Sequence, residues 1–184
     1  MTVYREEQRE ETHLSKPFMK PRIFFEFLGR RYFVEDIPSK DDSISLDVGC
    51  GTRPHGDINV DIGPTQTNTH PRNLRTRANV YADGCYLPFK DGAFGDVYSF
   101  DVIEHVPDPV KFVRELERVG GRITIVTPHR FAPNNNRNPT HIYGFNRTWF
   151  TRLGYDVQVT WVSVPFLFFF SIQRVGNIWA TKTK

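Results

Sequence analysis

Residues 46–61, LDVGCGTRPHGDINVD, join an apolar run to a glycine turn and place a carboxylate, Asp61, ten residues after Gly51. The run over residues 43–48 has the composition of a short strand that ends at Gly49. In an open parallel sheet, ligands bind beyond the carboxyl ends of the strands, where a glycine turn lets the backbone approach them closely. This stretch therefore predicts the first strand of an α/β sheet with a ligand at its end.

Strand-like and helical patterns alternate downstream of this turn. A helix is predicted after Asp108, because Asp108 can cap it, Pro109 suits its first position and Gly120 follows its apolar stripe. A shorter helix is predicted over residues 147–153. Further strands are predicted over residues 58–62, 79–82, 96–100, 122–127, 155–162 and 177–181. This order predicts a mostly parallel α/β sheet with an antiparallel hairpin at its C-terminal edge.

The length of 184 residues suits one domain, and 39% apolar residues is typical of a globular protein. We expect a core over residues 43–184 and an N-terminal extension over residues 1–42, with a covering amphipathic helix at 21–31. Cys50 and Cys85 lack paired spacing, and the charged N-terminus lacks the apolar core of a signal peptide. Both features favour a cytoplasmic protein.

Several common ligand motifs do not fit the glycine turn. A nicotinamide fingerprint would place a third glycine where this chain has Pro54, and its acid would follow after about twenty residues rather than ten. The chain also has no GK[ST] phosphate loop and no Gly-x-Ser-x-Gly elbow. A dinucleotide oxidoreductase is therefore disfavoured.

The ordered set LDVGCG, NVDI, ADGCYLPFKDGAFGDVYSFDVIEHVPDP and GGRITIVTP resembles the class I S-adenosylmethionine-dependent methyltransferases, in particular the methyltransferase type 11-like family. The likeness covers roughly residues 43–181. It implies a Rossmann-like class I methyltransferase sheet, S-adenosyl-L-methionine as cofactor and S-adenosyl-L-homocysteine as product. Only about eight residues separate the first two strands, whereas a parallel crossover normally takes about a dozen or more. We therefore expect an abbreviated first crossover over residues 52–56.

The resemblance also implies a role for individual residues. Asp47 would favour the ammonium and sulfonium charges of the cofactor. Asp61 would accept hydrogen bonds from both ribose hydroxyls, and Asp83 would accept one from the adenine amine. The implied cofactor-binding set is Asp47, Gly49, Cys50, Gly51, Asp61, Ile62, Asp83, Gly84 and Phe100.

Methyl transfer from a sulfonium mainly requires alignment and exclusion of water, so a dedicated base is optional. Glu104, His105, His129 and His141 follow the late strands and are candidate proton acceptors. Each of these side chains also has a structural interpretation. The histidines and cysteines show no ligand spacing such as Cys-x-x-Cys, so no metal site is predicted.

Charge and apolar patterning bear on the acceptor. From Gly121 onward the chain has eight Lys or Arg against one acid, a net charge of +7, while the rest carries −4. With the loop at 131–140 and the apolar run at 161–172, this favours an anionic or partly apolar small molecule. The run is too short for a transmembrane segment, which needs about twenty residues. The run has four possible roles: core packing, a wall of the substrate site, a dimer face or a membrane-surface contact.

Two other functions stay open at this point. The chain could be a nucleic-acid-binding protein that keeps the fold without catalysis, because basic charge and aromatic residues suit single strands. It could also methylate a protein or RNA. Methylation of amino groups on DNA bases is disfavoured, because SFDVIEH replaces the Asp/Asn-Pro-Pro-aromatic motif after the fourth strand.

Overall fold

The computed structural model describes residues 22–25, 31–34, 43–63, 76–132, 135, 138–166 and 170–184. The chain divides into two compact units, Met1–Pro38 and Ser39–Lys184. Among the described residues, no helix has the length and apolar character needed to cross a bilayer. The boundary expected after residue 42 stays a prediction.

The first unit contains a hairpin where the sequence predicts a helix. Strand β1 (Arg22–Phe25) pairs antiparallel with strand β2 (Arg31–Val34), with Arg22 opposite Val34. The helix prediction over residues 21–31 is therefore wrong. The segment contains Ile23 and the phenylalanines at 24, 25 and 27, which favour a pleated strand, and the apolar spacing fitted a helical period by coincidence.

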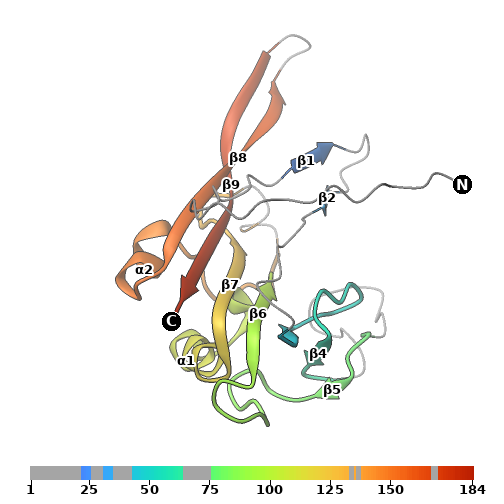
Figure 1. Cartoon of the computed structure of the whole chain (residues 1–184). Coiled ribbons are helices and arrows are strands. Elements are labelled where there is room, and N and C mark those ends of the chain that lie inside the picture. Colours follow the sequence, from blue (N-terminus) through green and yellow to red (C-terminus); the bar gives the residue numbers. More distant parts are fainter. Residues whose placement is uncertain are drawn as a thin grey trace, which may run out of the picture. The chain divides into compact units, whose positions relative to one another are not determined.

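The second unit is built on a seven-stranded sheet with the order β5-β4-β3-β6-β7-β9-β8 (Figure 1). The strands are β3 (Ser45–Val48), β4 (Ile58–Asp61), β5 (Val80–Tyr81), β6 (Phe94–Phe100), β7 (Gly120–Pro128), β8 (Asp156–Phe166) and β9 (Phe170–Thr183). Strands β3 to β7 pair in parallel, and β9 pairs antiparallel with both β7 and β8. The predicted sheet, with its antiparallel C-terminal edge, is confirmed.

The first crossover is abbreviated, as predicted. Strands β3 and β4 are parallel neighbours, with Leu46 opposite Ile58, and the residues between them form turns rather than a helix. Hydrogen bonds within the crossover replace those of a helix. The His55 amide donates to the Asp47 carboxylate at 2.9 Å, and the Asn59 side chain donates to the Gly56 carbonyl at 2.8 Å.

One helix packs its apolar stripe into the core of the sheet. Helix α1 (Pro109–Val119) begins where the Asp108 carboxylate accepts a hydrogen bond from the Lys111 amide at 2.9 Å. The buried residues of α1 belong to the same apolar cluster as Val97 of β6 and Ile123 of β7. They are Phe112, Val113, Leu116 and Val119. Two shorter helical segments are η1 (Ile103–His105) and α2 (Arg147–Arg152).

The C-terminal hairpin is longer than the sequence indicates. Residues 177–183 of β9 pair with β7, whereas residues 170–175 pair with β8 alone, so the end of the hairpin extends beyond β7 (Figure 1). Residues 161–166 and 170–172 of the apolar run belong to this extension, and residues 167–169 lie outside the described part. Trp161 is 59% exposed, and the side chains of residues 162–173 lie outside the described part. The role of the run therefore stays open.

Candidate functional site

The predicted ligand-binding residues meet at one edge of the sheet. Asp83 follows β5, Asp61 ends β4, the glycine turn follows β3 and Phe100 ends β6. Because β5, β4, β3 and β6 are parallel neighbours in that order, their carboxyl ends line one continuous edge. The sheet thus brings together the carboxyl ends of four strands that are separate along the chain.

The glycine turn is held by its own backbone amides. The Gly49 and Cys50 amides donate to the Val60 carbonyl at 2.8 and 3.1 Å, and the Gly51 amide donates to the Asp61 carboxylate at 2.9 Å. Gly49 and Gly51 have φ values of 82° and 53°. A β-carbon on Gly49 would also overlap the side chain of Val102. Backbone conformation and packing both require glycine there.

Asp47 presents a buried oxygen without a partner. Its side chain is 1% exposed, and its Oδ2 atom accepts from the His55 amide, but Oδ1 has no hydrogen-bond partner among the described residues. Burial is the main reason that the pKa of Asp47 rises to about 7, and the nearby Asp61 carboxylate adds to this effect. An orphaned carboxylate oxygen is costly unless a cation or donor meets it. Asp47 therefore fits the positively charged end of the implied cofactor.

Asp61 is fixed by two backbone donors. Its Oδ1 atom accepts from the Ile62 amide at 2.8 Å, and its Oδ2 atom accepts from the Gly51 amide. A carboxylate oxygen has two acceptor sites, so each oxygen keeps one for a ribose hydroxyl. The side chain of Ile62 is 74% exposed next to it, which offers an apolar surface to a nucleoside base.

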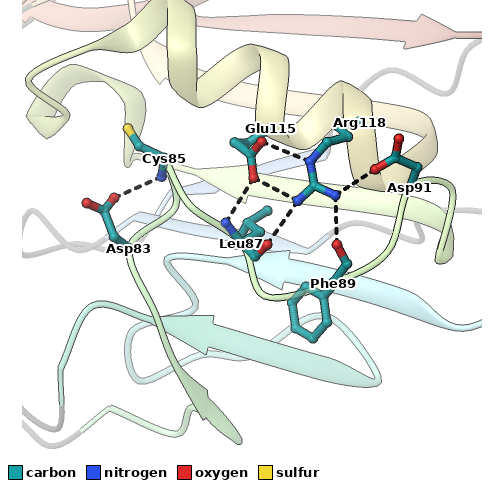
Figure 2. A network of polar contacts seen from close by, with 7 residues as sticks. All are labelled: Asp83, Cys85, Leu87, Phe89, Asp91, Glu115 and Arg118. Carbon is teal, nitrogen blue, oxygen red and sulfur yellow. Dashed lines mark hydrogen bonds and ion pairs between the residues drawn. The ribbon is translucent and has the colours of Figure 1, made fainter.

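Asp83 lies in a segment that is fastened to α1. Its Oδ1 atom accepts from the Cys85 amide at 2.8 Å. Figure 2 shows the fastening: Arg118 donates to the carbonyls of Leu87 and Phe89 at 2.9 and 2.7 Å. Arg118 also pairs with the carboxylates of Asp91 and Glu115, at 2.8 Å each. A β-carbon on Gly84 would overlap Phe112 of α1, so the segment packs closely on the helix.

Phe100 and Cys50 complete the predicted cofactor set. Phe100 is half-buried, and the ring of His55 packs edge-on against it, with centroids 4.9 Å apart. His55 could not be identified from the sequence, because its contact with Phe100 depends on the path of the abbreviated crossover. The Cys50 thiol is buried and donates to the Gly51 carbonyl, and burial raises its pKa to about 12. Only the backbone of Cys50 is therefore available to a ligand.

Two of the three candidate histidines meet beyond β6 and β7. The rings of His105 and His141 pack edge-on with centroids 4.7 Å apart. The pKa of each is lowered, mainly by burial. The carboxylate of Glu104 joins them: one ligand atom from each of these residues lies within 4.8 Å of the others. The prediction of no metal site considered only ligands close together in sequence, and it stays a prediction.

His129 is placed differently from the other two histidines. Its backbone amide donates to the Gly176 carbonyl at 2.9 Å, and its Nδ1 atom accepts from the Phe131 amide at 3.2 Å. It does not belong to the cluster of Glu104, His105 and His141. These contacts give His129 a structural role at the end of β7. Its direct participation in catalysis stays a prediction.

Glu104 is a fully buried acid in the cluster with His105 and His141. Its side chain is fully buried, its Oε2 atom accepts from the Thr127 hydroxyl at 2.9 Å, and Oε1 has no partner among the described residues. Burial is the largest cause that raises its pKa to about 8, followed by the charge of Asp101. A carboxylate flanked by apolar residues in VIEHV was the available signal.

Several known methyltransferases are similar to this chain. Residues 46–125 match a family described as a methyltransferase domain. A protein of Mycobacterium tuberculosis named as a probable S-adenosylmethionine-dependent methyltransferase is 30% identical over 168 residues, covering 82% of this chain and 58% of that protein. Tocopherol O-methyltransferase of Arabidopsis thaliana is 43% identical over 70 residues, covering 36% of this chain and 19% of that protein. The chain thus spans less than two thirds of these curated relatives.

A solved structure agrees with the fold. The crystal structure of an S-adenosylmethionine-dependent methyltransferase from Thermotoga maritima superposes with a TM-score of 0.53 at 17% sequence identity. The match covers 78% of this chain and 84% of that one. At this identity the likeness supports the fold alone.

Proposed function

We propose that the chain is an S-adenosylmethionine-dependent methyltransferase of the methyltransferase domain family whose model matches residues 46–125. We propose further that its acceptor is a small molecule with an anionic and an apolar part. The observation that carries the proposal is the meeting of Asp47, Asp61 and Asp83 at one sheet edge.

The three aspartates match the three parts of the cofactor in spatial order. Asp47 would pair through its unpartnered oxygen with the cationic methionine end, Asp61 would bind the ribose and Asp83 the adenine amine. When bound, S-adenosylmethionine supplies an electrophilic methyl group on a sulfonium that is a good leaving group. The protein then has to hold the acceptor in line with that methyl group and exclude water.

The described residues after β7 support the choice of acceptor. Phe131, Ile142 and Tyr143 are exposed at 64%, 56% and 41%. The guanidinium of Arg130 lies over the Phe131 ring, 4.6 Å from its centroid. The backbone amides of Ile142 and Tyr143 donate to the Glu104 carbonyl at 2.8 and 3.2 Å, which fastens this segment to η1. Apolar rings beside a cation suit an acceptor that has both an apolar part and a negative charge. The tocopherol methyltransferase similarity also favours a small molecule.

A thermal shift experiment tests the cofactor. S-adenosylmethionine, S-adenosylhomocysteine and NAD are added in parallel to the full chain. A ligand at 100 times its dissociation constant stabilises the fold by about 2.7 kcal/mol. We expect a shift with the first two ligands and none with NAD. A shift with NAD alone, or tight binding of single-stranded RNA with steep salt dependence and no cofactor binding, would overturn the proposal.

A panel of acceptors tests the substrate class. Formation of S-adenosylhomocysteine is measured with aromatic acceptors that differ only in a carboxylate or phosphate group. Anionic members should react with the lower KM, and Arg130→Gln should raise that KM while sparing neutral analogues. Arg147→Gln, an exposed arginine on α2, is the matched control. Equal KM values for charged and neutral acceptors would refute the anionic preference.

A further inference from the structure

Two histidines and one glutamate converge between η1 and the segment after β7. Glu104 and His105 belong to η1, and His141 comes from the connection between β7 and α2. One ligand atom from each residue lies within 4.8 Å of the others. Ligands bound at about 2.1 Å to one ion lie at most about 4.2 Å apart, so the side chains need to move by less than about 1 Å.

Each of the two imidazoles has its Nδ1 atom within hydrogen-bond distance of an oxygen. His105 has its Nδ1 atom 3.0 Å from the Thr140 carbonyl oxygen, and His141 has its Nδ1 atom 2.9 Å from the Asn135 side-chain oxygen. Both contacts are to acceptors, so each Nδ1 atom carries the proton and donates. Each Nε2 atom then keeps a free lone pair. Metal-binding histidines almost always donate their other ring N–H to an oxygen in this way, which fixes the tautomer.

The glutamate adds an independent indication of a ligand. Its side chain is fully buried, and the Thr127 hydroxyl donates to Oε2, while Oε1 has no hydrogen-bond partner among the described residues. A buried carboxylate oxygen without a partner is costly, and metal coordination is one of the few arrangements that offsets the cost. The donated hydrogen bond orients the ligating carboxylate as well.

We propose that Glu104, His105 and His141 form a binding site for one divalent transition-metal ion. Two imidazoles and a carboxylate suit Zn²⁺, Fe²⁺, Co²⁺ or Mn²⁺. They do not suit Mg²⁺, which prefers an all-oxygen octahedral shell. Nothing in this choice depends on the cofactor.

The ion would have a place in the acceptor half of the site. Three protein ligands leave coordination positions open, as in catalytic zinc sites. Ile142 and Tyr143, which border the cluster, also contribute to the exposed apolar surface assigned to the acceptor. If the chain methylates a small acceptor as proposed, an acceptor hydroxyl bound to the ion would lose its proton to solvent more readily. The oxygen would then attack the methyl carbon as the bond from carbon to sulfur breaks.

Metal binding is measured on the untagged full chain after dialysis against a chelator, without cofactor. Co²⁺ is titrated by visible absorption and Zn²⁺ by calorimetry, with Mg²⁺ as a contrast. We expect about one equivalent of Co²⁺ and of Zn²⁺. His105→Ala and His141→Ala should each weaken binding at least about tenfold, and His129→Ala, a histidine outside the cluster, should leave it unchanged.

Circular dichroism spectra of the variants, together with S-adenosylhomocysteine binding, separate local loss from misfolding. Absence of Co²⁺ and Zn²⁺ binding to the unaltered chain would overturn the site, even if the cofactor binds. Equal affinity in the unaltered chain and in folded His141→Ala protein would do the same. Loss of cofactor binding by the unaltered chain with metal binding intact would instead count against the proposed function alone.

Discussion

Asp61 accepts a hydrogen bond from the backbone amide of Gly51, with 2.9 Å between Oδ2 and the nitrogen. The carboxylate at the end of β4 thus fixes the glycine turn at the end of β3. It also keeps acceptor capacity for a ribose, because its two oxygens each receive only one backbone donor. One side chain therefore couples the shape of the turn to the proposed cofactor contact.

This coupling predicts different results for two substitutions at Asp61. Asp61→Ala removes the acceptor for Gly51 and the ribose contact, so the free energy of unfolding should fall by about 1–3 kcal/mol and cofactor binding should be lost. Asp61→Asn keeps one acceptor oxygen, so it should lose less stability but still bind the cofactor at least about tenfold more weakly. Denaturant melts and calorimetry measure both. Full affinity in Asp61→Ala would refute the ribose contact.

The side chain of Val102 packs so closely against Gly49 that substitution of Gly49 by alanine should destabilise the fold. Gly49→Ala places a β-carbon at a positive φ and against Val102, and should cost about 2–4 kcal/mol of unfolding free energy. Gly92→Ala is the matched control, because Gly92 also has a positive φ, 65°, but no neighbouring atom within 4 Å. It should cost about 1 kcal/mol. Adding Val102→Ala to Gly49→Ala should recover part of the loss, and no recovery would contradict the packing account.

Asp47 predicts a pH dependence of stability. Its pKa in the folded protein is about 7, above the ordinary value of 3.8, so between these values the folded state binds more protons than the unfolded state. Stability therefore falls as pH rises from about 4 to about 7, by at most about 1.4 kcal/mol per unit. Asp47→Asn should remove this slope. Urea melts at pH 5 and pH 7 measure it, and identical slopes for both proteins would contradict the assignment.

The same carboxyl group should release a proton when the cofactor binds. A cation near Oδ1 favours the ionised form, so at pH 6 binding must deprotonate Asp47. Calorimetry in two buffers of different ionisation enthalpy counts the protons. We expect release by the unaltered chain and little by Asp47→Asn.

The sequence predicts the sheet well because its strands and α1 are locally encoded. Asp108, Pro109 and Gly120 mark the ends of α1, and the structure confirms both ends. The helix expected at residues 21–31 is not formed, because a short apolar run of phenylalanines with Ile23 is compatible with the period of a helix and with that of a strand. Whether such a run forms a helix or a strand depends on its pairing partners rather than on its local spacing.

The candidate site also contains contacts that the sequence could predict and contacts that it could not. The glycine turn and Asp61 are close in sequence, so their contact could be predicted from spacing and family resemblance. The meeting of Glu104 and His105 with His141 depends on the path of the chain after β7, which local patterns do not encode. The unpartnered oxygens of Asp47 and Glu104 likewise appear only when the tertiary neighbours are known.

We expect the hydrogen bonds of Arg118 to stabilise the segment that carries Asp83. Arg118→Ala removes the side-chain donor from the carbonyls of Leu87 and Phe89 and leaves the Glu115 carboxylate with the Leu87 amide, so it should cost about 1–3 kcal/mol. Cofactor affinity should fall several-fold because Asp83 loses its support. The control is Arg114→Ala, an exposed residue of the same helix, which should change stability by less than about 0.5 kcal/mol. Equal effects of the two variants on chemical denaturation would count against this network.

We propose that the glycine turn, Asp61 and Asp83 together hold one S-adenosyl nucleoside. A crystal structure of the chain grown with S-adenosylhomocysteine tests it most directly. We expect the ribose hydroxyls within hydrogen-bond distance of the Asp61 carboxylate, the adenine beside Asp83 and the amino acid end beside Asp47. Density for the ligand at any other place, with this sheet edge bare, would contradict it.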